Sequence, residues 1–313
     1  MRAMSPVTWG DPSVLREVTV HRPVPLPTEI QVRVHAAGVN PTDWKSRAGG
    51  GFGLWGDPPI LGFDVAGVVT AVGLGVTLVK PGDEVFGMPW FPRQAGAYAQ
   101  YVTAPARHFA PKPASLSFVE AAALPLVSLT AWQALVDTAA VRPGQRVLVH
   151  AAAGGVGHVA VQIAKARGAH VIGTASAAKH EFLRSLGVDE PIDYTAVDFT
   201  TVVQDVDVVV DPIAGAYGSR SLRVLRPSGI LVSIASPIDA ELAAEAATLG
   251  VRAAFVLVEP DHQGLVEIAS LVDSGRLRPE VETVLPLAEA AKAHIIGETG
   301  RTTGKIVLSV VHP

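Results

Sequence analysis

The sequence predicts an α/β protein of two domains, one a small all-β partial barrel and the other a doubly wound parallel sheet. Three observations support this prediction. The chain of 313 residues is 49% hydrophobic and 17% charged, so it can bury more than one core. Short segments separated by glycine and proline run from residue 17 to about residue 111. From residue 146, apolar strands alternate with amphipathic helices.

The first domain is predicted from short apolar segments that suit strongly bent strands. Segments 30–34, 65–72 and 97–103 are the clearest of them. The character changes near Ser117, where residues 118–136 take up helical spacing.

The second domain is predicted from a βαβ series, which implies a parallel sheet. Its predicted strands are 146–150, 170–174, 206–211, 229–234 and 251–257. Its clearest predicted helices are 159–167, 179–186 and 219–225, followed by a helical stretch at 260–274. Segment 304–310 is a last apolar strand, which we expect to return to the first domain.

Composition excludes several classes of function. A net charge of -4 and the lack of a basic cluster argue against nucleic acid as a partner. The N-terminal residues show no secretory signal. The apolar stretch 147–164 contains His150 and several glycines, unlike a membrane helix. We therefore expect a cytoplasmic protein. The chain has no cysteine, which excludes disulfides, thiolate catalysis and zinc sites that need cysteine.

A glycine-rich turn joins the first strand and helix of the parallel sheet. Small residues there let the backbone approach a pyrophosphate, and the helix N-terminus offers free N–H groups. Ala152 stands where the usual pattern has its first glycine. No Gly-Lys-Ser/Thr ending of a Walker loop follows. The turn residues predicted to bind a dinucleotide are Ala153, Gly154, Gly155, Val156 and Gly157.

The end of the second strand indicates which dinucleotide binds. NAD enzymes commonly place a carboxylate there, on the ribose 2'-hydroxyl. After Thr174 this sequence has Ser176 and Lys179 but no acid. A hydroxyl and a cation suit a 2'-phosphate, so NADP (NADPH) is the predicted cofactor. A solvated lysine in a first helical turn is the alternative interpretation of Lys179.

Several separated motifs resemble the quinone oxidoreductase, or zeta-crystallin-like, branch of the medium-chain dehydrogenase/reductase superfamily. They are GVNPTDWK at 38–45, LGFDVAG at 61–67, KPGDEVFG at 80–87 and AGGVG at 153–157. The resemblance implies a GroES-like catalytic domain at 1–118 and 278–313, a Rossmann domain at 119–277 and an active site between them. It also implies a homodimer, formed by edge pairing of strand 251–258.

The resemblance also implies that zinc is absent. Zinc-dependent relatives carry a ligand Cys where this chain has Asn40, and a ligand His where it has Phe63. Without a Lewis acid to polarise an alcohol or carbonyl, we expect a substrate that is already electrophilic. A quinone or an α,β-unsaturated carbonyl (enone) fits.

The resemblance places further residues near the cofactor. Lys179, Tyr194 and Arg301 would surround the 2'-phosphate. The remaining predicted cofactor contacts are Asn40, Thr130, Thr174, Ser176, Ala235 and Val256.

The predicted reaction is hydride transfer to the substrate β-carbon or quinone, with Asn40, a backbone N–H or water donating to the substrate oxygen. Asp43 would orient the loop or the ribose, or else bond its own turn after Pro41. A resemblance to enoyl reductase domains would instead make Lys179 and Asp198 proton donors.

A flat substrate is suggested by aromatic residues in loop-like parts of the first domain: Trp44, Phe52, Trp55, Trp90 and Phe91. Ordinary core packing is the alternative for each of them. A dinucleotide-binding sensor or crystallin-like protein without turnover also stays open, because fold does not fix chemistry.

Overall fold

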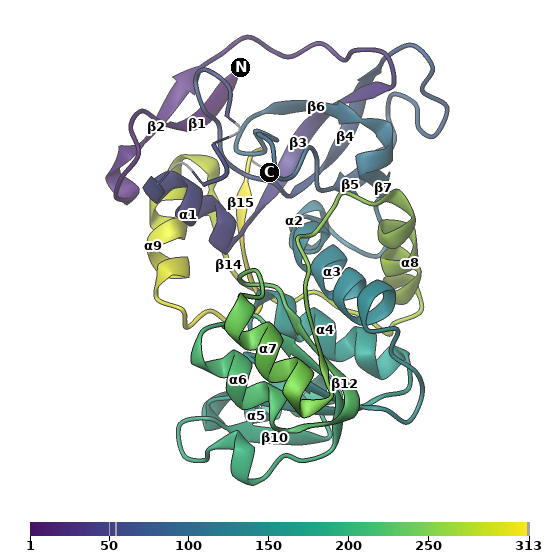
Figure 1. Ribbon diagram of the computed structural model, residues 1–313. Helices are drawn as coiled ribbons and strands as arrows, with labels where there is room; N and C mark the ends of the chain where they lie inside the picture. The colour runs from purple at the N-terminus through teal and green to yellow at the C-terminus, as the bar shows by residue number, and fades with distance from the viewer. Residues whose placement is uncertain (50, 54, 312–313) are drawn as a thin grey trace. The chain divides into compact units, whose positions relative to one another are not determined.

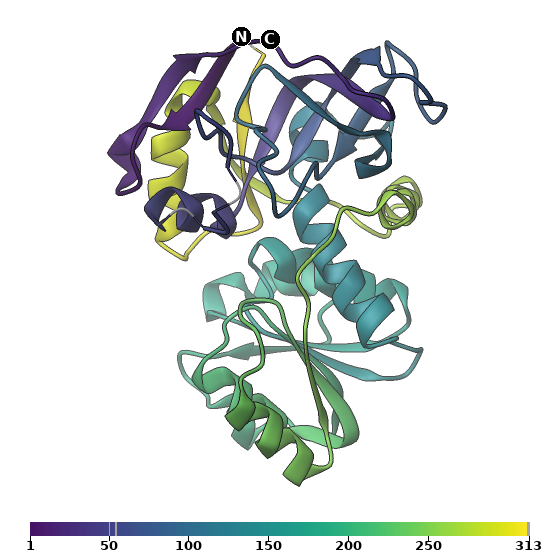
Figure 2. The same cartoon turned by 45° about the horizontal axis from the view of Figure 1, so that its top comes forward.

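The computed structural model describes residues 1–49, 51–53 and 55–311, and its contacts divide the chain into two compact units (Figures 1 and 2). The first unit comprises Met1–Leu129 and Glu259–Pro313, and the second Thr130–Val258. The predicted fold class is confirmed: a unit of mainly antiparallel strands accompanies a parallel α/β sheet. Segments 119–129 and 259–277 lie in the first unit, because α2 (Phe118–Ala122) packs on β3 (Glu29–Val39) and β4 (Val65–Val72), and α8 (His262–Asp273) packs on β7 (Phe109–Pro111).

The first unit is built on one bent sheet whose strands run in the order β14-β15-β3-β4-β5-β7, with β6 also paired to β3. A separate pair, β1 and β2, is antiparallel. The strands are β1 (Arg2–Pro6), β2 (Leu15–Thr19), β3 (Glu29–Val39), β4 (Val65–Val72), β5 (Glu84–Gly87), β6 (Tyr101–Pro105), β7 (Phe109–Pro111), β14 (Val281–Pro286) and β15 (Lys305–Ser309). The helices are η1 (Pro12–Val14), α1 (Pro41–Gly49), η2 (Ala106–His108), α2 (Phe118–Ala122), α8 (His262–Asp273), η6 (Leu287–Glu289) and α9 (Ala290–Glu298).

The last strand returns to the first domain, as predicted. β15 lies antiparallel to β3, with Ile306 opposite Val39 and Leu308 opposite Ala37 (Figure 1). Every residue of β15 except Ser309 is buried, although the strand begins with a lysine. The loop that follows β3 is therefore held against a segment more than 260 residues away in the chain.

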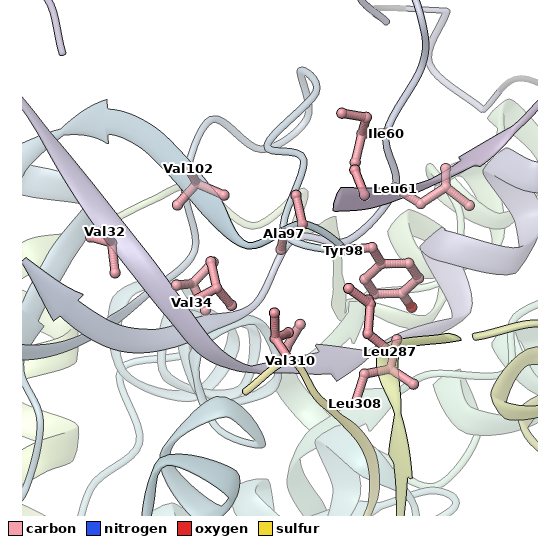
Figure 3. Close-up of a cluster of buried hydrophobic side chains, with 14 of the residues drawn as sticks. Val32, Val34, Ile60, Leu61, Ala97, Tyr98, Val102, Leu287, Leu308 and Val310 are labelled. Atoms are coloured by element: carbon pink, nitrogen blue, oxygen red, sulfur yellow. The ribbon is translucent and has the colours of Figure 1, made fainter. Parts of the chain in front are cut away.

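The core of the first unit gathers apolar side chains from distant segments. Figure 3 shows Val32 and Val34 of β3 on one side of this cluster and Leu308 of β15 on the other, together with Leu61 and Tyr98 from loops. All five have 2% or less of their surface exposed. Burial of this kind contributes roughly 1.5–3 kcal/mol for each large side chain.

The second unit has a parallel sheet in the strand order β10-β9-β8-β11-β12-β13. Helices α6 and α7 lie side by side, as Figure 1 shows. The strands are β8 (Arg146–Val149), β9 (His170–Ala175), β10 (Glu190–Asp193), β11 (Val206–Asp211), β12 (Leu225–Ser233) and β13 (Arg252–Phe255). The helices are η3 (Gln133–Thr138), α4 (Gly155–Ala166), η4 (Ala177–Lys179), α5 (His180–Ser185), η5 (Phe199–Thr201), α6 (Ala216–Leu222) and α7 (Ala240–Leu249). Helix α3 (Pro125–Trp132) contains the boundary between the units.

Two of the differences from the sequence prediction concern β12 and α7. Leu225 was expected to end a helix, but it begins β12, where its backbone pairs with Val206. Helix α7 was not predicted, although Asp239 caps its first turn and Gly250 ends it in the left-handed conformation. Within the described ranges, no helix is long and apolar enough to cross a membrane.

Substituting Ser117→Ala tests the start of α2. The Ser117 hydroxyl accepts the N–H of Glu120, whose carboxylate accepts the Ser117 N–H in return. We expect the free energy of unfolding to fall by about 1 kcal/mol, because one amide loses its cap. Urea unfolding followed by tryptophan fluorescence measures it. Ser117→Thr is the control, and equal stability of the Ala variant and the wild type would contradict the prediction.

Candidate functional site

The turn between β8 and α4 is shaped to receive an anion. Gly154 is the N-cap of α4, has an extended backbone and supplies no side-chain cap. The first-turn amides therefore lack the side-chain acceptor that usually caps them. A Cβ on Gly157 would lie 2.3 Å from the carbonyl oxygen of Ala151, so only glycine lets the helix start this close to the turn. A phosphate fits such a helix start.

The turn also lies at the point where the strand order reverses. From β8 the chain moves to β9 and β10 on one side, and then resumes at β11 on the other side. Ligands of doubly wound sheets bind beyond the carboxyl ends of the strands at this point. The five predicted turn residues are all found here, in the turn or in the first turn of α4.

Three of the residues predicted to bind the 2'-phosphate share one edge of the sheet. Ser176 follows β9, and Lys179 ends the short helix η4 directly after it. Tyr194 follows the neighbouring strand β10, is 53% exposed, and donates its N–H to Ala175. An acid at this edge, Asp193, uses its carboxylate to accept the N–H and hydroxyl of Thr195.

The other predicted cofactor residues have varied surroundings. Thr174 is 1% exposed, and its hydroxyl accepts the Ala151 N–H at 3.2 Å, so it supports the turn from below. Ala235 follows β12, Val256 follows β13, and Thr130 is buried in α3. Arg301 is exposed and belongs to the first unit, and its place beside the phosphate remains a prediction.

The two residues predicted to be catalytic lie in a buried polar cluster of the first unit. Asn40 follows β3 and Asp43 is in the first turn of α1, and both are fully buried. Asp43 accepts the N–H of Asn40 at 2.7 Å through Oδ2 and that of Gly62 at 3.2 Å through Oδ1. Asp43 thus bonds its own turn, which was one of its two predicted roles, and also holds the loop at Gly62.

A buried lysine closes this cluster. The Lys305 ammonium donates to the carbonyl oxygen of Val39, to Oδ1 of Asn40 and to Oδ2 of Asp64. Asp64 also accepts Nδ2 of Asn40 at 2.8 Å and the N–H of Leu126 at 2.7 Å. Three acceptors meet the three donors of an ammonium group. The Asn40 amide is therefore held with its oxygen toward the cation and its nitrogen toward the carboxylate.

The pKa values of this cluster depart from their ordinary values, and its contacts extend to His294 of α9. Burial raises the pKa of Asp43 to about 7, opposed by the Asn40 N–H and assisted by the charge of Asp64. Burial lowers the pKa of Lys305, against the pull of Asp64. The Tyr98 hydroxyl bonds Asp43 and lies 3.3 Å from Nε2 of His294, which is itself fully buried.

Sequence reasoning missed Asp64, Tyr98, His294 and Lys305. A signal existed for two of them. Asp64 interrupts an otherwise apolar segment, and Lys305 opens a strand whose next three residues are apolar. A charge inside a segment that must be buried needs a partner of opposite sign.

Three of the five aromatic residues predicted to line a substrate pocket lie in one row of rings. Phe52, Trp55 and Phe91 join a row of rings through Phe63, with ring centroids 5.0–6.1 Å apart. Trp44 was expected in a loop, but it lies in helix α1 and packs against Gly297.

Trp90 is not part of this row, because its indole N–H donates to the Thr103 carbonyl and its ring packs edge-on against His108. The row includes Phe63, and Asp64 follows it in the chain.

Asp198, the alternative proton donor, is fixed in its ionised form. It caps η5 and pairs with Arg220 at 2.7 Å. The Arg220 side chain and the N–H of Thr200 lower the pKa of Asp198 to about 2. A carboxyl group with so low a pKa has already lost its proton near neutral pH and is therefore a poor proton donor.

The pKa of Asp43 predicts how stability depends on pH. Asp43 binds its proton more tightly in the folded chain, where its pKa is about 7, than at its ordinary value of 3.8. Between these values the folded state holds more protons, so the free energy of unfolding falls as pH rises from about 4 to about 7. Asp43→Asn should flatten this slope in urea unfolding series. The exposed Asp273→Asn is the control, and parallel slopes for wild type and Asp43→Asn would contradict the assignment.

Comparison with known proteins agrees with this arrangement. The family described as "Alcohol dehydrogenase GroES-like domain" matches residues 26–114, and the one described as "Zinc-binding dehydrogenase" matches residues 186–308. The chain is 35% identical to 2-methylene-furan-3-one reductase of Solanum lycopersicum, over 100% of this chain and 79% of that protein. It is 39% identical to the pikromycin polyketide synthase component PikAII of Streptomyces venezuelae, over 92% of this chain but only 8% of that protein.

Solved structures show the same relationship. The quinone oxidoreductase from Coxiella burnetii has a TM-score of 0.93 and 37% identity, with 99% of each chain covered. The Escherichia coli quinone oxidoreductase complexed with NADPH has a TM-score of 0.87 and 30% identity, with 99% of this chain and 100% of that one covered. An NAD-dependent alcohol dehydrogenase reaches a TM-score of 0.91 and 37% identity, with 99% and 100% covered. The chain belongs to the quinone oxidoreductase branch of the medium-chain dehydrogenase/reductase superfamily.

Proposed function

We propose that this oxidoreductase uses NADPH to reduce a quinone or the activated C=C bond of an α,β-unsaturated carbonyl, without zinc. The observation that carries the proposal is the turn before α4, uncapped by any side chain of its N-cap residue and placed where the strand order reverses. Bound NADPH would supply the hydride for the substrate.

The preference for NADPH rests on the edge formed by β9 and β10. Ser176 and Lys179 offer a hydroxyl and a cation to a 2'-phosphate, with Tyr194 beside them. The carboxylate at this edge, that of Asp193, is already used by Thr195. An E. coli relative was solved with NADPH, which supports the same choice.

The proposal excludes zinc because the side chains do not fit it. The chain has no cysteine, and Asn40 and Phe63 stand where relatives have metal ligands. The Lys305 ammonium already donates to Oδ1 of Asn40, so a cation occupies that side of the amide. Within the described part of the chain, no three His, Asp or Glu side chains gather in a way that would hold a metal.

The substrate follows from these features. Without a Lewis acid, the carbon that accepts the hydride must be electrophilic already, as in a quinone or enone. The ring row of Phe52, Trp55, Phe63 and Phe91 suits a flat, apolar molecule. Asn40 and Asp43 are buried and already hydrogen-bonded to their neighbours, so we assign them the positioning of the loop that follows β3. Water or a backbone N–H would then donate to the substrate oxygen.

An enoyl reductase is the second candidate. The 39% identity to a polyketide synthase component favours it. The ionised state of Asp198 argues against the proton donor that this mechanism would use.

A cytoplasmic homodimer, paired through the edge strand β13, completes the proposal.

Substituting Lys179→Ala separates the two candidates. Losing a charge-assisted bond to phosphate should raise the KM for NADPH about 10-fold or more. The kcat at saturating NADPH should stay near the wild-type value. Steady-state kinetics with a quinone and an enone measure both. Lys292→Ala, an exposed lysine of α9, is the control. A collapse of kcat with NADPH saturated would instead make Lys179 a proton donor.

Removal of metal should leave turnover unchanged. We expect a panel of quinones and enones to oxidise NADPH at the same rate before and after the protein is dialysed against a chelator. The reason is that the Lys305 ammonium already lies where a metal ion would contact Oδ1 of Asn40. Absorbance of NADPH and elemental analysis provide the measurements. Stoichiometric zinc would refute the zinc-free mechanism. NADPH binding without oxidation by any substrate would favour a sensor without turnover.

A further inference from the structure

Three buried polar side chains form the floor of the dinucleotide turn. His150 directly follows β8, Thr174 lies in β9 and Ser221 lies in α6. Each has 1% or less of its surface exposed. Polar groups buried this deeply are costly unless they are hydrogen-bonded, so their partners matter.

The three side chains form one continuous hydrogen-bond bridge. Thr174 Oγ1 lies 3.3 Å from Nδ1 of His150, and Nε2 of the same ring lies 3.0 Å from Ser221 Oγ. At its upper end the Thr174 hydroxyl accepts the N–H of Ala151 at 3.2 Å. The bridge thus runs from helix α6, across the end of β8, to the first residue of the turn.

The imidazole suits this position only as a neutral ring. Burial and the positive charge of Arg220 lower the pKa of His150 to about 3. The rings of Phe199 and Tyr217 approach it with centroids 4.7 and 5.1 Å away. A neutral imidazole has one donor and one acceptor, and both of its neighbours are hydroxyls that can act as either. The bridge is therefore complete in either tautomer.

The residue held by the bridge determines the shape of the turn. Ala151 has a φ of 45°, a left-handed conformation that residues with a Cβ disfavour. Its carbonyl oxygen accepts the N–H of Gly154 and packs against Gly157. Any change at Ala151 is therefore passed directly to the start of α4.

We propose that His150, Thr174 and Ser221 are positioning residues that hold Ala151, and through it the turn, in the conformation that receives the cofactor pyrophosphate. This inference rests on the proposed binding of NADPH. None of the three side chains needs to touch the cofactor, because the bridge acts on the backbone. Thr174, predicted as a cofactor contact, acts from beneath the turn.

The isosteric substitution Thr174→Val tests the bridge. It removes the acceptor of the Ala151 N–H and the partner of His150 while keeping the shape of the side chain. We expect the Kd for NADPH, measured by fluorescence titration, to rise about 10-fold. The kcat at saturating NADPH should change less than about 2-fold, since groups facing the substrate are untouched. Thr174→Ser, which keeps the hydroxyl, should restore affinity.

Two further variants complete the test. Thr248→Val, an exposed threonine of α7, is the matched control. Ser221→Ala cuts the bridge at its far end and keeps the inference testable if Thr174→Val does not fold. It should raise the Kd by about 3-fold, and the double variant should bind no more weakly than Thr174→Val alone.

The outcomes separate the two proposals. A wild type that binds NADPH, with Thr174→Val and Ser221→Ala binding it equally well, would overturn the bridge and leave the proposed function standing. A wild type without affinity for NADPH would overturn the proposed function, and the bridge with it.

Discussion

A buried lysine joins distant segments of the first unit. Lys305 opens β15, and its ammonium joins the end of β3, the Asn40 amide and Asp64 in a single contact. Removing one partner of a buried ion pair commonly costs about 3–5 kcal/mol, because the other charge stays buried and unpaired. This contact holds the loop after β3 against Asp64, the residue that follows Phe63.

In the second unit the buried polar groups are neutral. The turn before α4 must leave its backbone amides open to a ligand, so its own side chains cannot cap them. Its conformation therefore has to be held by side chains packed beneath it. His150 supplies that support through two hydroxyls and stays uncharged among aromatic rings. Both units thus bury hydrogen-bonded polar groups behind the loops that we propose meet a ligand.

The sequence predicted what depends on neighbours in the chain. The apolar run of β11 and the small residues before α4 could be recognised because period and composition report local structure. The partners of Asn40 could not, because Lys305 is 265 residues away and no periodicity encodes such a pairing. Trp44 was misplaced for a related reason. It was expected in a loop-like part of the first domain, whereas Pro41 begins the helix α1 that contains it.

The division of the chain also affects its biosynthesis. The second unit is one continuous stretch, whereas the first is assembled from segments on both sides of it. During translation the ribosome releases β3 long before β15, so an apolar strand edge waits unpaired while the second unit can already fold. Nascent chains of this protein should accordingly be most vulnerable to aggregation, and most dependent on chaperones, until residues 305–309 emerge.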